Sequence, residues 1–208
     1  MKNSYVENNK VIVSAQNIKE NVMPRLRPSC NLADIERDDI AYCKFLDMIE
    51  TFYITVNEKI GVRLNISTDI LEKIGMTLDE LRDCAHRNIA GNWKMMKLTE
   101  VIEQLTGNDN IPDTDNPLYV VSTNESMYGA ATVLSEEIME VVTERLKGGF
   151  VILPSSVHEV LVLSKKDLDE YGTLLEIVRS INRTEVSETE FLSDNIYIYE
   201  DGSYRIVD

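Results

Sequence analysis

The chain has 208 residues, of which 43% are hydrophobic and 27% are charged, so it can bury a sizeable core and is not intrinsically disordered. Its net charge of -15 is uneven: residues 1–104 carry 14 basic and 16 acidic side chains (net -2), and residues 105–208 carry 7 and 20 (net -13). This charge argues against direct binding of nucleic acid or anionic membrane and favours a basic partner, although it also serves to keep a protein soluble.

The cysteines and apolar runs indicate a soluble, cytoplasmic protein. Cys30, Cys43 and Cys84 are odd in number and lie far apart without a C-x-x-C pair, which argues against a disulfide framework or a zinc module. No apolar run approaches the ~18 residues that a membrane span requires, and the N-terminus lacks the apolar core of a signal peptide. Phosphate-binding loops, dinucleotide fingerprints and H-E-x-x-H are absent, so we expect no cofactor.

The first half of the chain begins with an ambiguous segment. Residues 10–27 fit either a helix that ends near Pro24 or Pro28, or a strand followed by a helix, and residues 28–39 are polar enough to be a connection. Residues 40–56 end in a β-branched and aromatic strand. After a turn at 57–61, residues 62–66 return as its hairpin partner.

Helix signals follow this hairpin. Residues 68–74 predict a short helix that stops at Gly75. Thr77 and Glu80 form a capping box for the next helix, with Met76 packed against Leu81 as a hydrophobic staple. A further helical pattern ends at Gly107.

The second half alternates strands and helices. We expect strands at 118–122, 128–134, 150–153 and 160–163, helices at 135–147 and 167–182, and a closing hairpin of 196–200 with 203–207. Asp201-Gly202 is a strong two-residue hairpin signal, and it places Tyr199 opposite Tyr204 and Tyr197 opposite Ile206.

These elements predict an α+β fold, with an antiparallel sheet built from successive hairpins and helices packed on one face. The organisation is an N-terminal helical and hairpin region (1–106), an acidic loop (107–117) and an acidic hairpin-helix-hairpin-helix-hairpin region (118–208). The loop is the one plausible boundary, and we expect the two regions to form one continuous domain.

The densest chemistry lies between the two apolar strands at 150–163. Ser155, Ser156, His158 and Glu159 are of the nucleophile, base and acid types that acyl transfer uses. However, adjacent strand residues point to opposite faces and no glycine-bounded nucleophile elbow is present. We therefore favour a structural turn over a ligand- or partner-binding site, and a binding site over a catalytic one.

Other candidate residues have simple structural explanations. His86, beside Arg87, is interpreted as a half-buried surface histidine, and a chain with two histidines is a poor candidate for a histidine-rich metal site. The loop that contains Asp109, Asp113 and Asp115 lacks the glycine and the terminal glutamate of a calcium-binding loop. We therefore expect a solvated acidic loop and no metal site.

A partner-binding surface is the remaining possibility. Tyr197, Tyr199 and Tyr204 share one face of the closing hairpin, and the acidity of this half argues against base stacking there. Their face is therefore either core or a protein-binding surface. We take as candidate partner-binding residues these three tyrosines and the helix glutamates Glu136, Glu137, Glu140 and Glu144.

Several motifs occur in an order that resembles one family. They are Phe45-Leu-Asp47, Thr77-Leu-Asp-Glu-Leu81, Pro117-Leu-Tyr-Val-Val-Ser-Thr-Asn124, Gly129-Ala-Ala131, Ile152-Leu-Pro-Ser-Ser-Val-His-Glu-Val160, Ile181-Asn-Arg-Thr184 and Leu192-Ser-Asp194. They resemble an uncharacterised domain-of-unknown-function family, number 5688, of anaerobic Gram-positive bacteria and their mobile elements. The resemblance covers most of the chain and implies no activity.

Our functional hypothesis is a non-enzymatic acidic interaction protein with a basic protein partner. Its sharpest form is a mobile-element-encoded nucleic-acid mimic that inhibits a nucleic-acid-binding bacterial defence complex. The alternative is a small ligand-binding domain or hydrolase-like enzyme centred on the Ser-Ser-Val-His-Glu turn.

Overall fold

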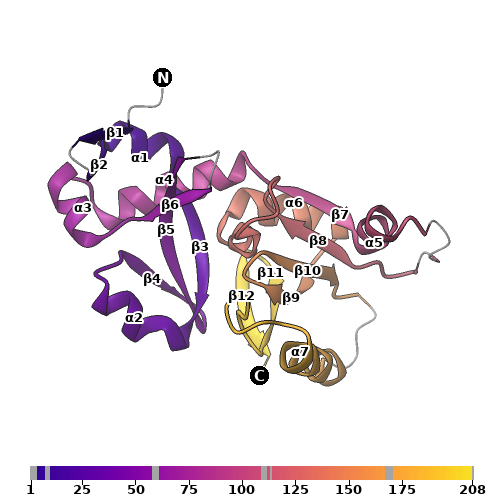
Figure 1. Cartoon of the computed structure of the whole chain (residues 1–208). Helices are drawn as coiled ribbons and strands as arrows, with labels where there is room; N and C mark the ends of the chain where they lie inside the picture. Colours follow the sequence, from indigo (N-terminus) through magenta and orange to yellow (C-terminus); the bar gives the residue numbers. More distant parts are fainter. Residues whose placement is uncertain are drawn as a thin grey trace. The chain divides into compact units, whose positions relative to one another are not determined.

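The computed structural model describes residues 4–7, 10–57, 61–108, 112, 114–166 and 171–207. The chain forms two compact units, Met1–Gly91 and Asn92–Asp208 (Figure 1). The division lies upstream of the loop at 107–117, where the sequence predicts the boundary. The reason is that strands on either side of that loop pair with each other, which places residues 92–106 with the second unit.

The first unit contains a four-stranded antiparallel sheet organised around one long strand. Its strands are β3 (Met23–Pro28), β4 (Tyr42–Phe45), β5 (Met48–Asn57) and β6 (Val62–Asn65). β3 pairs along β5, while β4 and β6 pair with successive parts of β5. A separate hairpin joins β1 (Ser4–Glu7) to β2 (Lys10–Val13).

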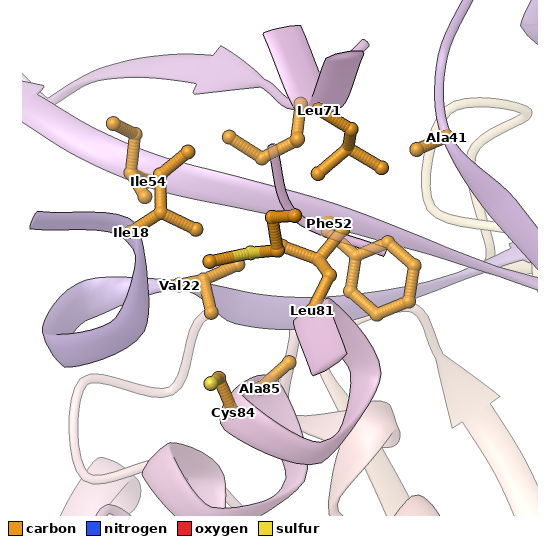
Figure 2. Close-up of a cluster of buried hydrophobic side chains, with 11 residues drawn as sticks. Ile18, Val22, Ala41, Phe52, Ile54, Leu71, Leu81, Cys84 and Ala85 are labelled. Carbon is orange, nitrogen blue, oxygen red and sulfur yellow. The ribbon is translucent and has the colours of Figure 1, made fainter. Parts of the chain in front are cut away.

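Helices bury one face of this sheet. They are α1 (Ala15–Asn21), α3 (Thr68–Ile74) and α4 (Leu78–Ala90); the short η1 (Ser29–Asn31) and α2 (Leu32–Arg37) lie between β3 and β4. Figure 2 shows the resulting core, in which Phe52 and Ile54 of β5 meet Ile18, Leu71 and Leu81 of the three helices. All five side chains are buried.

The predicted capping box is present at the start of α4. The Glu80 backbone N–H donates to Thr77 Oγ1 at 3.2 Å, and the Thr77 N–H donates to Glu80 Oε2 at 2.9 Å. These bonds satisfy backbone donors that the first turn of a helix otherwise leaves open. Gly75 ends α3 with a φ of 67°, as its position in the sequence predicts.

The second unit contains a six-stranded antiparallel sheet in the order β12-β11-β9-β10-β8-β7. Its strands are β7 (Lys94–Lys97), β8 (Tyr119–Ser122), β9 (Phe150–Ser156), β10 (Glu159–Ser164), β11 (Ile196–Glu200) and β12 (Ser203–Val207). Its helical segments are α5 (Leu98–Thr106), η2 (Gly129–Leu134), α6 (Glu136–Leu146) and α7 (Gly172–Thr184).

Helices cover both faces of this sheet, whereas the sequence predicts helices on one face. Leu175 and Val178 of α7 pack with Val151 and Leu153 of β9. On the opposite face, Arg145 of α6 lies over the Tyr119 ring of β8. The strand β9 explains this arrangement, because all of its residues from Phe150 to Pro154 are buried. A strand with apolar side chains on both faces of the sheet requires cover on both faces.

The α+β class is confirmed, and so are three of the four predicted hairpins, which lie at 48–65, 150–164 and 196–207. In the closing hairpin, Tyr199 pairs with Tyr204 and Tyr197 with Ile206, as predicted. The antiparallel pairing is distributed over separate sheets instead of one. Among the described residues, no helix is long and apolar enough to cross a membrane.

Four local predictions are wrong or incomplete. Residues 128–134 form the helical turn η2 instead of a strand, because the backbone N–H groups of Gly129 and Ala130 bond to carbonyls of the β9–β10 turn. Residues 10–27 follow the strand-then-helix alternative, with the further strand β3 after them. Residues 28–39 contain two short helices, and the apolar stretch from residue 40 is broken at Leu46, whose φ is 54°.

Candidate functional site

The turn between β9 and β10 is docked against the segment that precedes α6. Ser155 and Ser156 end β9, Glu159 begins β10, and Val157 and His158 form the turn between them. The His158 carbonyl accepts hydrogen bonds from the Ser122 hydroxyl at 2.7 Å and from the Gly129 N–H at 2.9 Å. The Val157 N–H donates to the Glu190 carbonyl at 2.8 Å.

The His158 side chain is engaged in the same contact. Its Nδ1 accepts a hydrogen bond from the Tyr128 N–H at 3.1 Å, and its ring stacks on the Tyr128 ring with centroids 5.5 Å apart. Tyr128 has a φ of 54°, an uncommon value for an aromatic residue, so this contact holds a strained backbone in place. Because Nδ1 accepts, the neutral imidazole carries its proton on Nε2.

Gly129 permits this close approach. A Cβ at this position would lie 2.2 Å from Ser122 Oγ, 2.5 Å from the Thr123 nitrogen and 2.6 Å from the His158 carbonyl oxygen. Two of these atoms belong to the backbone, which cannot move aside as the end of a flexible side chain can. The glycine is therefore required by space, which explains its place in the Gly-Ala-Ala motif.

The two serine hydroxyls bond to groups other than the imidazole. Ser156 Oγ accepts from the His158 backbone N–H at 3.0 Å, and Ser155 Oγ donates to Glu159 Oε1 at 3.4 Å. A hydrolase-like site requires a hydroxyl that donates to the imidazole. The described contacts of Ser155, Ser156, His158 and Glu159 form a folded turn and contain no such nucleophile–base pair.

The candidate glutamates of α6 lie on its solvent side. Ile138, Met139, Val142 and Leu146 bury the other side of the helix, and Ser135 Oγ accepts the Ile138 N–H at its start. The exposed carboxylates are those of Glu136, Glu137, Glu140 and Glu144. Among the described residues, none of these four forms an ion pair.

Two of the three candidate tyrosines, Tyr197 and Tyr199, are buried in the core and Tyr204 is half-buried beside them, which favours the core alternative over a protein-binding face. Tyr197 is 2% exposed and Tyr199 6%, and the Tyr204 hydroxyl donates to the Val133 carbonyl of η2. Tyr199 lies between Phe150 and Tyr204, with ring centroids 5.2 and 4.8 Å away. Burial, and then the charges of Glu136 and Glu140, raise the pKa of Tyr199 above its usual value.

A buried ionic cluster in the first unit was missed by the sequence reasoning. Glu50 of β5 is fully buried and accepts from His86 Nε2 at 2.7 Å and from Arg82 Nε at 3.2 Å. The His86 side chain is 20% exposed and that of Arg82 is 44% exposed. His86 is half-buried, as the sequence predicts, and it is also the partner of a core carboxylate, which the sequence analysis does not predict.

A signal for this cluster existed in the sequence. Glu50 stands two residues before Phe52, so both side chains point to the same, core-facing side of the strand. A carboxylate there requires cationic or hydrogen-bonding partners. Arg82 and His86 are four residues apart and lie on one side of α4.

Cys43 lies directly opposite Glu50 on β4. Burial, and then the negative charge of Glu50, raise the pKa of its thiol, so it is poorly suited to act as a nucleophile. Within the described part of the chain, no three His, Cys, Asp or Glu side chains form a group that could hold a metal ion. Asp109 and Asp113 lie outside the described residues, and Asp115 is exposed.

A protein-family model matches this chain. The family of unknown function DUF5688 matches residues 2–201, which is nearly the whole chain. Neither a curated protein nor a solved structure matches.

The structural role of His158 predicts a stability effect. His158→Ala removes the acceptor of the Tyr128 N–H and should lower the free energy of unfolding by about 1–3 kcal/mol. His158→Asn places an amide oxygen near the position of Nδ1 and should recover part of that loss. Urea unfolding of the three proteins provides the measurement. Equal stability of His158→Ala and the parent would show that the imidazole is not a structural group.

The ionic cluster predicts a double-mutant effect. His86→Ala leaves the Glu50 carboxylate with only Arg82 and should cost about 3 kcal/mol in urea unfolding at pH 7. Adding Glu50→Leu removes the buried charge and should restore at least half of that loss. Asp83→Ala, at an exposed position of the same helix, is the control and should change stability by less than about 0.5 kcal/mol. Purely additive effects of the His86 and Glu50 changes would contradict the coupling.

Proposed function

Since this chain belongs to the family of unknown function DUF5688, we propose its function from charge and geometry. The protein is a non-enzymatic interaction protein whose acidic second unit binds a basic protein surface. The observation that carries this proposal is the row of exposed glutamates on α6, none of which forms an ion pair within the described part of the chain.

The charge of the two units supports this choice of surface. Residues 1–91 contain 12 Lys and Arg against 14 Asp and Glu, whereas residues 92–208 contain 9 against 22, a net charge of -13. A surface whose charges have one sign accelerates association with a partner of opposite charge and repels partners of the same charge. The second unit therefore suits a partner rich in Lys and Arg.

The geometry of α6 supports a fixed arrangement of charges. Glu136, Glu140 and Glu144 are spaced by four residues, so they lie along one side of the helix about 6 Å apart. The buried residues of α6 pack into the core and fix the helix backbone, so the row of glutamates keeps its spacing. Regularly spaced negative charges are what a nucleic-acid-binding surface recognises along a phosphate backbone.

The sharper form of the proposal is a nucleic-acid mimic that inhibits a nucleic-acid-binding bacterial defence complex. The resemblance of the motifs to a family from anaerobic Gram-positive bacteria and their mobile elements supports this setting, because a mobile element gains from disabling host defence. The same setting supports a cytoplasmic location. The alternative centred on the β9–β10 turn has less support, because the polar groups of the turn bond to one another or to Ser122 and Tyr128.

The test is competition with DNA for a Lys- and Arg-rich protein that binds double-stranded DNA. The chain should bind this probe protein and displace DNA, with an affinity that falls steeply between about 50 and about 500 mM salt. The triple reversal Glu136→Lys, Glu140→Lys and Glu144→Lys should abolish binding without a large change in melting temperature, because all three positions are exposed.

A matched control separates the α6 surface from net charge. Glu176→Lys, Glu185→Lys and Glu188→Lys change the charge of the same unit by the same amount at exposed positions outside α6. This variant should keep most of the binding. Equal loss in both triple variants would show that α6 is not the binding surface, and binding that ignores salt and both reversals would contradict the proposal as a whole.

A further inference from the structure

A half-open cavity lies between the edge strand β7 and the helix α6 of the second unit. Its volume is about 320 Å³, within the range of sites that bind small molecules. Trp93, Lys94 and Met95 line it from the strand side, and Val141 and Arg145 line it from the helix. None of these residues belongs to the α6 glutamate row or to the β9–β10 turn.

The local structure explains why the cavity exists. Met95 of β7 pairs opposite Val121 of β8, and Trp93 directly precedes β7. Val141 and Arg145 are four residues apart and share a side of α6. At this edge of the sheet, α6 does not fully cover the apolar side chains that line the cavity, and Val141 remains 44% exposed.

The charges around the cavity are unusual for this acidic unit. Lys94 Nζ donates to the Asn124 carbonyl at 3.1 Å and to Ser126 Oγ at 2.8 Å, which uses two of its three donors. Arg145 lies 5.8 Å from the centre of the Tyr119 ring, and among the described residues it forms no hydrogen bond or ion pair. The Tyr119 ring holds the Arg145 guanidinium beside the cavity, and the N–H donors of the guanidinium remain available.

We propose that this cavity binds a small carboxylate with an apolar body. The apolar part would lie against Trp93, Met95 and Val141, and the carboxylate would accept hydrogen bonds from Arg145, whose guanidinium matches it in geometry. The net charge of -13 in this unit selects for a monoanion, because phosphate-rich ligands would be repelled. This binding activity goes beyond the proposed function and does not depend on it.

Octanoate is a suitable probe because it combines one carboxylate with an apolar chain. Trp93 is the only tryptophan of the chain, so its fluorescence reports on this cavity alone. Octanoate should change that fluorescence in a saturable way. Octan-1-ol, with the same chain and no charge, should bind at least about tenfold more weakly, because it lacks the charge-assisted hydrogen bonds to Arg145.

Three variants complete the test, each checked for its fold by circular dichroism. Arg145→Gln should weaken octanoate binding at least about tenfold and leave octan-1-ol binding unchanged. Val141→Glu places a carboxylate at the cavity wall and should abolish octanoate binding. Arg183→Gln, an equal charge change at an exposed position of α7, is the control and should bind like the parent.

The outcomes are decisive in either direction. Saturable binding that depends on Arg145 and on the carboxylate supports the site. A fluorescence change that never saturates, equal affinity for octan-1-ol and octanoate, or insensitivity to Arg145→Gln would overturn it. The experiment needs no basic partner protein, so its failure leaves the proposed function of the α6 glutamates unaffected.

Discussion

The second unit depends on the contact between the β9–β10 turn and the segment from Ser122 to Ala131. One backbone carbonyl, that of His158, accepts from both Ser122 and Gly129, and the imidazole of the same residue accepts from Tyr128. Only glycine fits at position 129. This contact fixes η2, whose residues are all buried, and η2 leads directly into the Ser135 cap of α6.

Fixing α6 in this way gives one helix three different surfaces. One side supplies buried residues to the core, a second presents the glutamate row to solvent, and Val141 with Arg145 forms a wall of the cavity beside β7. The polar groups that the sequence places close together, in contrast, are used to build the turn. We therefore propose function on the surfaces of α6 that the turn positions.

The sequence predicts the local elements well because their signals are local. The Thr77 capping box, the Gly75 helix end and the Asp201-Gly202 hairpin each depend on a few neighbouring residues. Residues 128–134 have the apolar character of a strand, but long-range bonds to the β9–β10 turn fold them as η2. The pairing of Glu50 with His86 joins residues 36 apart, and a single sequence does not show which distant side chains meet.

The imidazole of His158 is a fixed hydrogen-bond acceptor in this structure, and the tautomer of the imidazole reveals whether Nδ1 accepts in solution. Nitrogen NMR of the imidazole at neutral pH distinguishes a protonated from an unprotonated Nδ1. The structure predicts the tautomer with the proton on Nε2 and an unprotonated Nδ1 that shows hydrogen-bond coupling to the Tyr128 amide. A proton on Nδ1, or rapid averaging between the two tautomers, would show that the imidazole is not a fixed acceptor of the Tyr128 amide.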